Sequence, residues 1–226
     1  MEFFGREEEL EELRKVREKA RQGARFTVVT GRRRVGKTEL VKRAFADGKT
    51  PCVYLLVTRK TEKVQCAAFQ EEVEKVLGIR IRGRCETFKD VFEEIMAASV
   101  ERTFTLVVDE FQEFDRVNPG GFGDVQGVWD DYHVRAKLNL VVCGSVNRLM
   151  NKIFFNDAEP LYGRNTGRLH VDPFKASLLK KIFRHYRPDY SKKDLLALWT
   201  LTGGIARYVD LLMSNGAFTL NAMLET

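Results

Sequence analysis

Short apolar runs alternate with amphipathic stretches along the first three quarters of the chain. The apolar runs predict five strands, at 26–30, 52–58, 104–108, 138–143 and 168–171. Apolar residues at helical spacing predict helices at 6–21, from about Lys37 to Ala46, and at 62–77, 88–100 and 125–136. Because the strands are apolar on both faces, the pattern favours a parallel sheet with helices on both sides.

The pattern becomes purely helical after Pro173, with helices predicted at 175–186, 191–201 and 205–214. We therefore expect an α/β core over residues 1–172 and a small helical subdomain over 173–226. No apolar run approaches the roughly 20 residues needed to cross a bilayer. The N-terminus turns acidic at Glu7 to Glu9, unlike a secretory signal. These features predict a cytoplasmic protein without a membrane partner.

The loop after the first predicted strand carries the strongest chemical signal. Residues 31–38 read Gly-Arg-Arg-Arg-Val-Gly-Lys-Thr and match G-x-x-x-x-G-K-S/T without a mismatch. The glycines let successive N–H groups point at an anion, and the helix that begins near Lys37 adds its positive dipole end. A chance match in a surface turn is the alternative, and the preceding strand argues against it.

This match predicts that the loop binds the phosphates of a nucleotide. Lys37 can reach the β- and γ-phosphates, and the Thr38 hydroxyl can ligate Mg²⁺. The residues expected to bind the nucleotide are Gly31, Arg32, Arg33, Arg34, Val35, Gly36, Lys37, Thr38 and Glu39.

Two acids end the third predicted strand and help to identify the nucleotide chemistry. Asp109 would hold Mg²⁺, and Glu110 would orient and polarise the water that attacks the γ-phosphate. Plain helix-capping charges are the alternative explanation. A small-molecule kinase would not need Glu110, and the N-K-x-D motif of a GTPase is missing from the sequence. The motifs therefore predict hydrolysis of ATP·Mg²⁺ to ADP and phosphate.

The fourth predicted strand is followed directly by Gly144 and Ser145. A polar residue at this place can sense the γ-phosphate, with Ser145 as the first candidate and Asn147 as the second. A strand-ending turn with a serine cap explains the same residues equally well.

Charge and cysteine content narrow the remaining chemistry. The net charge of +6 and the pI of about 9.1 favour anionic partners without naming one. Basic runs also occur at 80–84 and 184–193, and a solvated face explains such runs at least as often as a nucleic-acid surface does. The four cysteines form no C-x-x-C pair, and the three histidines are scattered, so a zinc site or disulfide framework is not expected.

Six segments occur in an order that resembles a known family. They are Phe4-Gly5-Arg6-x-x-Glu9-Leu10, Gly31 to Thr38, Leu106 to Glu110, Gly144-Ser145, Pro160-Leu161-Tyr162-Gly163-Arg164 and Thr202-Gly203-Gly204-Ile205. The set resembles the archaeal and bacterial AAA-like ATPases of the STAND type, from the prokaryotic group whose members carry P-L-Y-G-R. The resemblance covers the chain from residue 3 to about 213.

The resemblance implies further site residues. Gly5 and Arg6, with Glu9, would lie beside the base of the nucleotide. Arg164 would approach the phosphates or a neighbouring chain; an ordinary loop arginine paired with Asp157 or Glu159 is the alternative for it and for Arg168. The two glycines at 203–204 would lie in a helical lid, often described as winged-helix-like. Ala206 departs from the family, which usually has proline there, and this departure bears on adenine contact and lid geometry.

Together these observations predict a three-layer α/β/α fold with a five-stranded parallel sheet and a C-terminal helical lid. The phosphate-loop strand should lie beside the Ser145 strand, and that strand beside the Asp109 strand. We expect an ATP- and ADP-binding switch that could act on a protein effector or a C-terminal effector domain and form a nucleotide-dependent oligomer. Two alternatives stay open: a non-hydrolysing, nucleotide-gated module and a DNA-associated ATPase.

Overall fold

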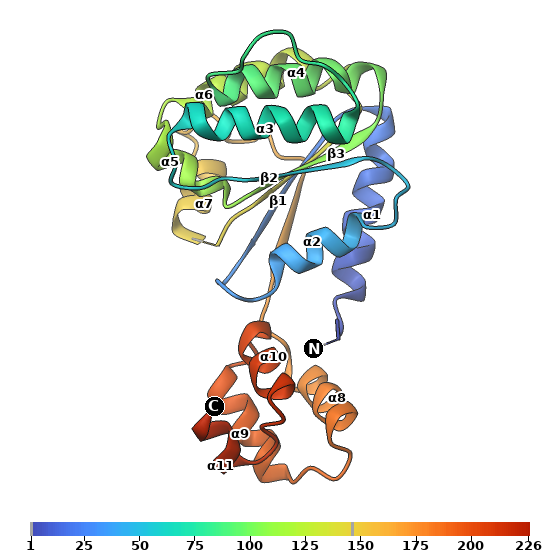
Figure 1. The fold of residues 1–226 in the computed structure, drawn as a ribbon, viewed down its shortest axis with the longest axis vertical. Helices are drawn as coiled ribbons and strands as arrows, with labels where there is room; N and C mark the ends of the chain where they lie inside the picture. The colour runs from blue at the N-terminus through green and yellow to red at the C-terminus, as the bar shows by residue number, and fades with distance from the viewer. Residues whose placement is uncertain (1, 146) are drawn as a thin grey trace.

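A five-stranded parallel sheet forms the centre of the larger body in the computed structural model, which describes residues 2–145 and 147–226 (Figure 1). Its strands are β1 (Arg25–Gly31), β2 (Cys52–Leu56), β3 (Phe104–Asp109), β4 (Leu138–Cys143) and β5 (Gly167–Val171). They lie in the order β2-β3-β4-β1-β5, and every neighbouring pair is parallel. The three-layer fold and the predicted neighbours of the phosphate-loop strand are therefore confirmed.

The sheet is buried on both faces because successive side chains of a strand point to opposite sides. Phe26 and Val28 of β1 pack into one apolar cluster, and Val29 packs into the other. Every residue of β3 and β4 is buried. This arrangement explains why these strands are apolar runs without polar alternation.

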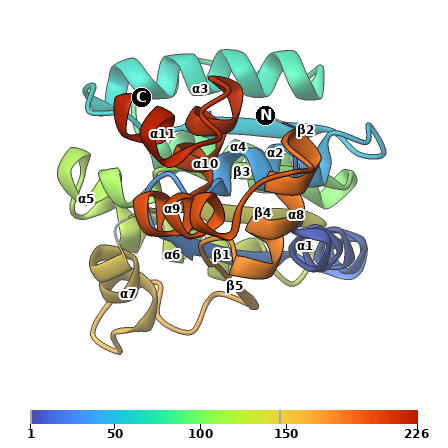
Figure 2. The ribbon, with the colours of Figure 1, turned by 90° about the horizontal axis from the view of Figure 1, so that it is seen from below.

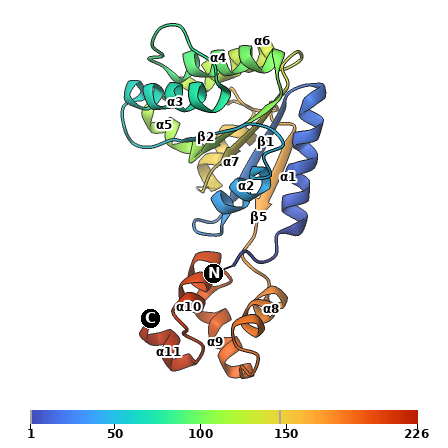
Figure 3. The same cartoon turned by 45° about the vertical axis from the view of Figure 1, so that its right-hand side comes forward.

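Helices cover the two faces unequally (Figure 3). One face carries α1 (Glu7–Lys19) and α2 (Lys37–Phe45), whose apolar residues pack on Val29 and its neighbours. The other face carries α3, α4, α6 and α7, at Glu62–Leu77, Phe88–Glu101, Gly121–Tyr132 and Asn147–Phe155. Thr87 caps α4 as predicted, since its side chain accepts a hydrogen bond from the Asp90 N–H.

Several short elements were not predicted from the sequence. A 3-10 turn, η1 (Ala20–Gln22), extends α1; a second, η2 (Phe111–Glu113), and α5 (Phe114–Val117) follow β3 directly. Helix α7 was not predicted either, and α6 begins at Gly121, four residues earlier than expected. Phe111 and Phe114 are buried in the larger cluster, so tertiary packing orders a segment too short to show helical periodicity.

The C-terminal helices form a separate layer, here called the lid. They are α8 (Ala176–Tyr186), α9 (Lys192–Thr202), α10 (Ala206–Ser214) and α11 (Leu220–Glu225). Leu179, Phe183, Leu198 and Val209 help to form an apolar core of their own. Seen from below, the lid lies over the edge of the sheet at which the strands end (Figure 2).

Gly204 joins the lid to the segment that leaves β5. Its φ is +72°, and a Cβ atom at this position would lie 2.3 Å from the carbonyl oxygen of Phe174. The Phe174 N–H donates to the Gly204 oxygen at 2.7 Å. Only glycine fits this close backbone approach, which accounts for Gly204, whereas Gly203 ends α9 in a left-handed conformation with φ +53°. Among the described residues, no helix is both long and apolar enough to cross a membrane.

Candidate nucleotide-binding site

The phosphate loop connects β1 to α2 through three residues with positive φ. Gly31 has φ +149°, Arg34 +68° and Gly36 +99°. A Cβ atom on Gly31 would lie 2.5 Å from the Val171 oxygen of β5, so glycine permits the close approach of these strands at the mouth of the loop. Gly36 is the N-cap of α2, and the N-terminus of this helix therefore faces the loop.

Lys37 lies across the loop and is only 7% exposed. Its Nζ donates to the carbonyl oxygens of Gly31 at 2.9 Å and Arg32 at 3.0 Å. Burial lowers the pKa of the Lys37 ammonium group, while the nearby charges of Glu110 and Asp109 act in the opposite direction. The loop itself therefore holds the ammonium group at the place where phosphate oxygens would bind.

Asp109 ends β3 and faces the start of α2. Its Oδ2 accepts a hydrogen bond from the Thr38 hydroxyl at 2.7 Å and another from the Tyr54 hydroxyl, and its Oδ1 accepts from the Glu110 N–H at 2.9 Å. The side chain is almost fully buried. Burial, and then the Asp109 carboxylate, raise the pKa of the Tyr54 phenol, so it remains a neutral donor.

The Thr38–Asp109 pair fits a magnesium site. A hydroxyl and a carboxylate oxygen are hard ligands, and Mg²⁺ commonly takes one or two such protein ligands together with waters and phosphate oxygens. Tyr54 was not among the predicted site residues. Its place on the same face of the sheet as Asp109 depends on the pairing of β2 with β3, in which Tyr54 lies opposite Val107.

Glu110 has a left-handed backbone, with φ 54° and ψ 38°. Its Oε2 accepts from the Ser145 hydroxyl at 3.0 Å and from the side-chain amide of Gln112. The structure therefore brings the two predicted residues Glu110 and Ser145 together, although they are 35 positions apart. Gln112 is buried and was not predicted. The side chain of the second candidate, Asn147, lies outside the part of the chain that the structure describes.

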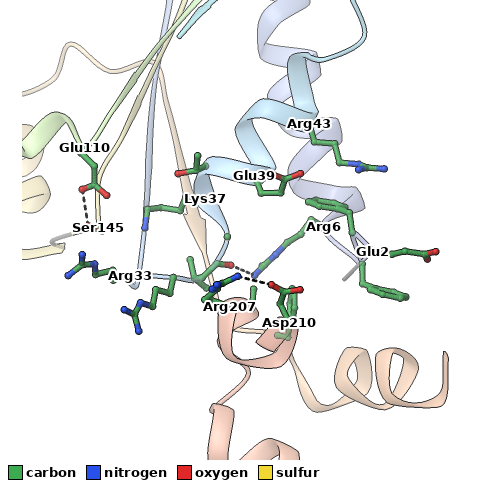
Figure 4. A pocket seen from close by; sticks show the side chains of 18 residues that line it. Glu2, Arg6, Arg33, Lys37, Glu39, Arg43, Glu110, Ser145, Arg207 and Asp210 are labelled. Atoms are coloured by element: carbon green, nitrogen blue, oxygen red, sulfur yellow. Dashed lines mark hydrogen bonds and ion pairs between the residues drawn. The ribbon is translucent and has the colours of Figure 1, made fainter. Parts of the chain in front are cut away.

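A pocket of about 940 Å³ opens between the phosphate loop, the N-terminal segment and the lid. Figure 4 shows Glu110, Ser145 and Lys37 on one side, Glu2 and Arg43 on the other, and Arg207 and Asp210 reaching in from the lid. The lining residues are Glu2, Phe3, Phe4, Arg6, Arg33, Arg34, Val35, Gly36, Lys37, Thr38, Glu39, Arg43, Glu110, Ser145, Phe174, Ala206, Arg207 and Asp210.

Arg6 connects the N-terminal segment to both the phosphate loop and the lid. Its guanidinium donates to Glu9 at 2.9 Å, to the Val35 oxygen at 3.4 Å and to the Asp172 oxygen. It also lies 5.0 Å from the centre of the Phe174 ring. Arg6 thus lines the pocket and also holds the N-terminal segment to the phosphate loop and to the linker before the lid.

The other two residues expected near the base of the nucleotide lie outside the pocket lining. Neither Gly5 nor Glu9 lines the pocket, whereas the aromatic residues Phe3 and Phe4 do. The N-terminal segment therefore offers aromatic rings and one arginine to a ligand.

Residues 3–212 match the model of a family described as an ATPase domain predominantly from Archaea. The chain belongs to this family. A curated relative, the uncharacterized protein MJECL04 of Methanocaldococcus jannaschii, is 26% identical over 208 residues. That alignment covers 92% of this chain and 43% of the relative, so the chain spans less than half of the relative's length.

Two solved structures share the fold of this ATPase domain. The Walker-type ATPase PABY2304 of Pyrococcus abyssi superposes with a TM-score of 0.69 and 22% identity, over 99% of this chain and 72% of that one. A STAND protein with a tetratricopeptide-repeat sensor, PH0952 of Pyrococcus horikoshii, gives a TM-score of 0.58 and 16% identity, over 93% and 30%. Identities this low show a common fold, and the narrower STAND type remains a hypothesis for this chain.

Arg164 is a further predicted residue of the ATPase domain that is not brought to the site. Arg164 pairs with Asp130 of α6, with contacts of 3.0 and 3.3 Å. It lies three residues before β5, at the edge of the sheet opposite the phosphate loop. This geometry corrects the expectation that Arg164 could approach the phosphates of its own chain, and its partner is neither Asp157 nor Glu159. The Arg168 guanidinium lies 3.9 Å from the centre of the Phe155 ring.

Proposed function

We propose that the chain hydrolyses ATP in this pocket and that nucleotide occupancy sets the position of the lid. One observation carries the proposal. Lys37, the Thr38–Asp109 pair and the Glu110–Ser145 pair converge at the edge of the sheet that the lid covers. These groups meet the three needs of phosphoryl transfer to water, which are phosphate binding, metal binding and orientation of the nucleophile.

The role of each group follows from its present contacts. Lys37 exchanges the carbonyl oxygens of Gly31 and Arg32 for the β- and γ-phosphate oxygens. Thr38 and Asp109 would hold Mg²⁺, which would supply positive charge to balance that of the phosphates. Glu110 orients the attacking water and accepts its proton. Ser145, which now donates to Glu110, lies close enough to that carboxylate to respond to the γ-phosphate.

Direct contacts between the phosphate loop and the lid support the switch. The N–H of Arg207 on α10 donates to the Arg34 oxygen at 3.2 Å, and the Arg34 guanidinium donates to the Tyr208 hydroxyl at 3.1 Å. Arg6 links the adjacent Val35 oxygen to the linker before the lid. A loop that changes shape around phosphates would move these partners, and α10 would follow.

Replacing the catalytic carboxylate tests the hydrolytic part of the proposal. Glu110→Gln should lower phosphate release by about 10²- to 10⁴-fold, because the amide cannot accept the proton of water. ATP affinity measured by calorimetry should change less than threefold. The matched control is Glu113→Gln, a half-buried acid in the same segment that pairs with the exposed Arg59. Wild-type turnover in Glu110→Gln would refute the assigned role.

Single-turnover measurements separate hydrolysis from the non-hydrolysing alternative. A stoichiometric burst of phosphate from bound ATP supports an ATPase switch, whereas bound ATP that stays intact favours a nucleotide-gated module. Hydrogen exchange at residues 204–210 then tests the lid. MgATP should protect these amides more than ADP does, and equal protection would contradict coupling between nucleotide and lid.

Outward action of the switch requires a partner, which we propose to be a protein effector or effector domain. A nucleotide-dependent oligomer would give Arg164 a role, because its guanidinium lies far from its own phosphate loop. Mixing Glu110→Gln with Arg164→Ala chains tests this arrangement. Partial recovery of turnover supports an arginine supplied by a neighbour, and purely additive rates contradict it.

A further inference from the structure

Outside the phosphate loop, the lid carries an excess of positive charge. Residues 173–226 contain eight Lys and Arg against four Asp and Glu, which gives +4 of the chain's net +6. The other basic run, at 80–84, has different surroundings. Residues 62–101, which include that run, contain six Lys and Arg against nine Asp and Glu, a net charge of −3. The arginines at 80–84 are therefore balanced locally, and the cations of the lid are not.

One face of α8 presents this charge to solvent. Lys180, Lys181 and Arg184 are exposed and fall within an arc of about 100° on a helix of 3.6 residues per turn. Residues 173–188 contain no acid, and the start of α9, which packs on α8, adds Lys192 and Lys193. Within the described part of the chain, none of these five side chains forms an ion pair within 4.0 Å.

We propose that this face, here called the α8 face, binds the phosphate backbone of duplex nucleic acid without reading sequence. A helix of 11 residues is about 16 Å long, which matches roughly five base-pair steps of 3.4 Å. The three cations Lys180, Lys181 and Arg184 lie on one side of the helix, where they can contact successive phosphates. The one aromatic ring at an exposed position of α8 is that of His185, and it already packs on Phe4 and Tyr186, which favours a duplex over a single strand whose bases need free rings to stack on.

A membrane surface fits the α8 face less well. Helices that lie on membranes bury an apolar face among the acyl chains. The apolar side of α8, formed by Leu179, Ile182 and Phe183, is already buried in the core of the lid. α8 lies at the periphery of the lid, where a long ligand can reach it (Figure 3).

The N-terminal segment connects the α8 face to the nucleotide pocket. Phe4 lines the pocket, and its ring lies 5.2 Å from that of His185 and 6.2 Å from that of Tyr186, at the end of α8. The Glu2 N–H donates to the Tyr186 hydroxyl at 3.2 Å. If the proposed ATPase switch operates, these contacts let nucleic acid on α8 influence the pocket, although binding itself does not depend on ATP.

The test measures fluorescence anisotropy of a labelled 20-base-pair DNA duplex of mixed sequence, without nucleotide, from 50 to 300 mM KCl. Lys180→Ala/Lys181→Ala/Arg184→Ala should weaken binding at least tenfold at 100 mM. It should also reduce the slope of log K against log salt by about 2.7, at about 0.9 per lost phosphate contact. Arg80→Ala/Arg82→Ala/Arg84→Ala removes the same charge from the core and should change Kd less than twofold.

The outcomes separate this proposal from the proposed ATPase function. Wild-type affinity in the α8 variant, equal losses in both triple variants, or a flat salt dependence would each overturn it. So would binding to anionic vesicles by a chain that does not bind the duplex. Lys37→Ala should keep its duplex affinity even if it loses nucleotide binding, so failure of the ATPase assignment leaves this result unaffected. Circular dichroism melting confirms that the exposed substitutions leave the fold intact.

Discussion

The pair of Arg17 and Asp47 offers a prediction whose size can be worked out from the structure. Arg17 of α1 is 2% exposed and reaches the turn after α2, where its two terminal nitrogens donate to the two Asp47 oxygens at 2.7 and 2.8 Å. This ion pair ties α1, the helix that follows Arg6, to α2, the helix that follows the phosphate loop. Asp47→Asn keeps the shape and removes the charge.

Two effects set the loss of folding free energy expected in Asp47→Asn. The Arg17 guanidinium, through its hydrogen bonds, lowers the pKa of Asp47 from 3.8 to about 2. Such a shift corresponds to about 2.4 kcal/mol at full strength. Solvent screening of the partly exposed carboxylate reduces this to about 1–1.5 kcal/mol. Leaving a buried guanidinium with a weaker partner adds to the loss, so we expect Asp47→Asn to cost about 2 kcal/mol at pH 7.

Urea denaturation of both proteins between pH 7 and pH 2 measures the effect. Because the folded pKa lies below the unfolded one, the wild-type advantage is complete above about pH 5 and disappears as the pH falls towards 2. Glu18→Gln, an exposed acid beside the same arginine, is the control and should cost less than about 0.5 kcal/mol. A difference below about 0.5 kcal/mol at pH 7, or one that grows on acidification, would refute this reasoning.

Three further predictions concern the site and the lid. Tyr54→Phe removes a hydrogen-bond donor from Asp109, so adding Mg²⁺ should improve ADP affinity about tenfold less than in the wild type. Calorimetry with and without EDTA tests this, and an equal gain of ADP affinity in both proteins would contradict it. Arg164→Ala should leave ATP affinity of the dilute chain within twofold, because the guanidinium pairs with Asp130; a tenfold loss would show contact within one chain. Gly204→Ala should cost about 2 kcal/mol or more, because φ is +72° and Phe174 is close; an unchanged melting temperature would show that the linker adapts.

The parts of the site that were predicted correctly are those encoded in short stretches of sequence. A strand, two glycines and a lysine within a few residues specify the phosphate loop without tertiary information. Asp109 and Glu110 could be assigned to the site because acids at the carboxyl end of a buried parallel strand lie at the same edge of the sheet as the phosphate loop. The strand order was also predicted correctly, from the layout of the ATPases that the chain resembles. All the segments that carry this resemblance belong to the α/β core and its lid.

The contacts that were missed depend on which strands and helices are neighbours. Tyr54 reaches Asp109 only through the register of β2 against β3. Gln112 lies in a one-turn helix too short to show periodicity, and its contact with Glu110 requires the left-handed turn at that residue. Arg164 was expected to approach the phosphates or a neighbouring chain, with a pair to Asp157 or Glu159 as the alternative. The acid that lies beside it in space is Asp130, 34 positions away.

The most direct test of the account is a calorimetric titration of MgATP into the wild type and Lys37→Ala. We predict one ATP bound per wild-type chain and at least a hundredfold loss of affinity in the variant, because the ammonium group is the one buried cation of the phosphate loop. Lys42→Ala, one turn further along α2 and outside the pocket lining, should bind like the wild type. Equal affinity in all three proteins would contradict the assignment of this loop as the phosphate site.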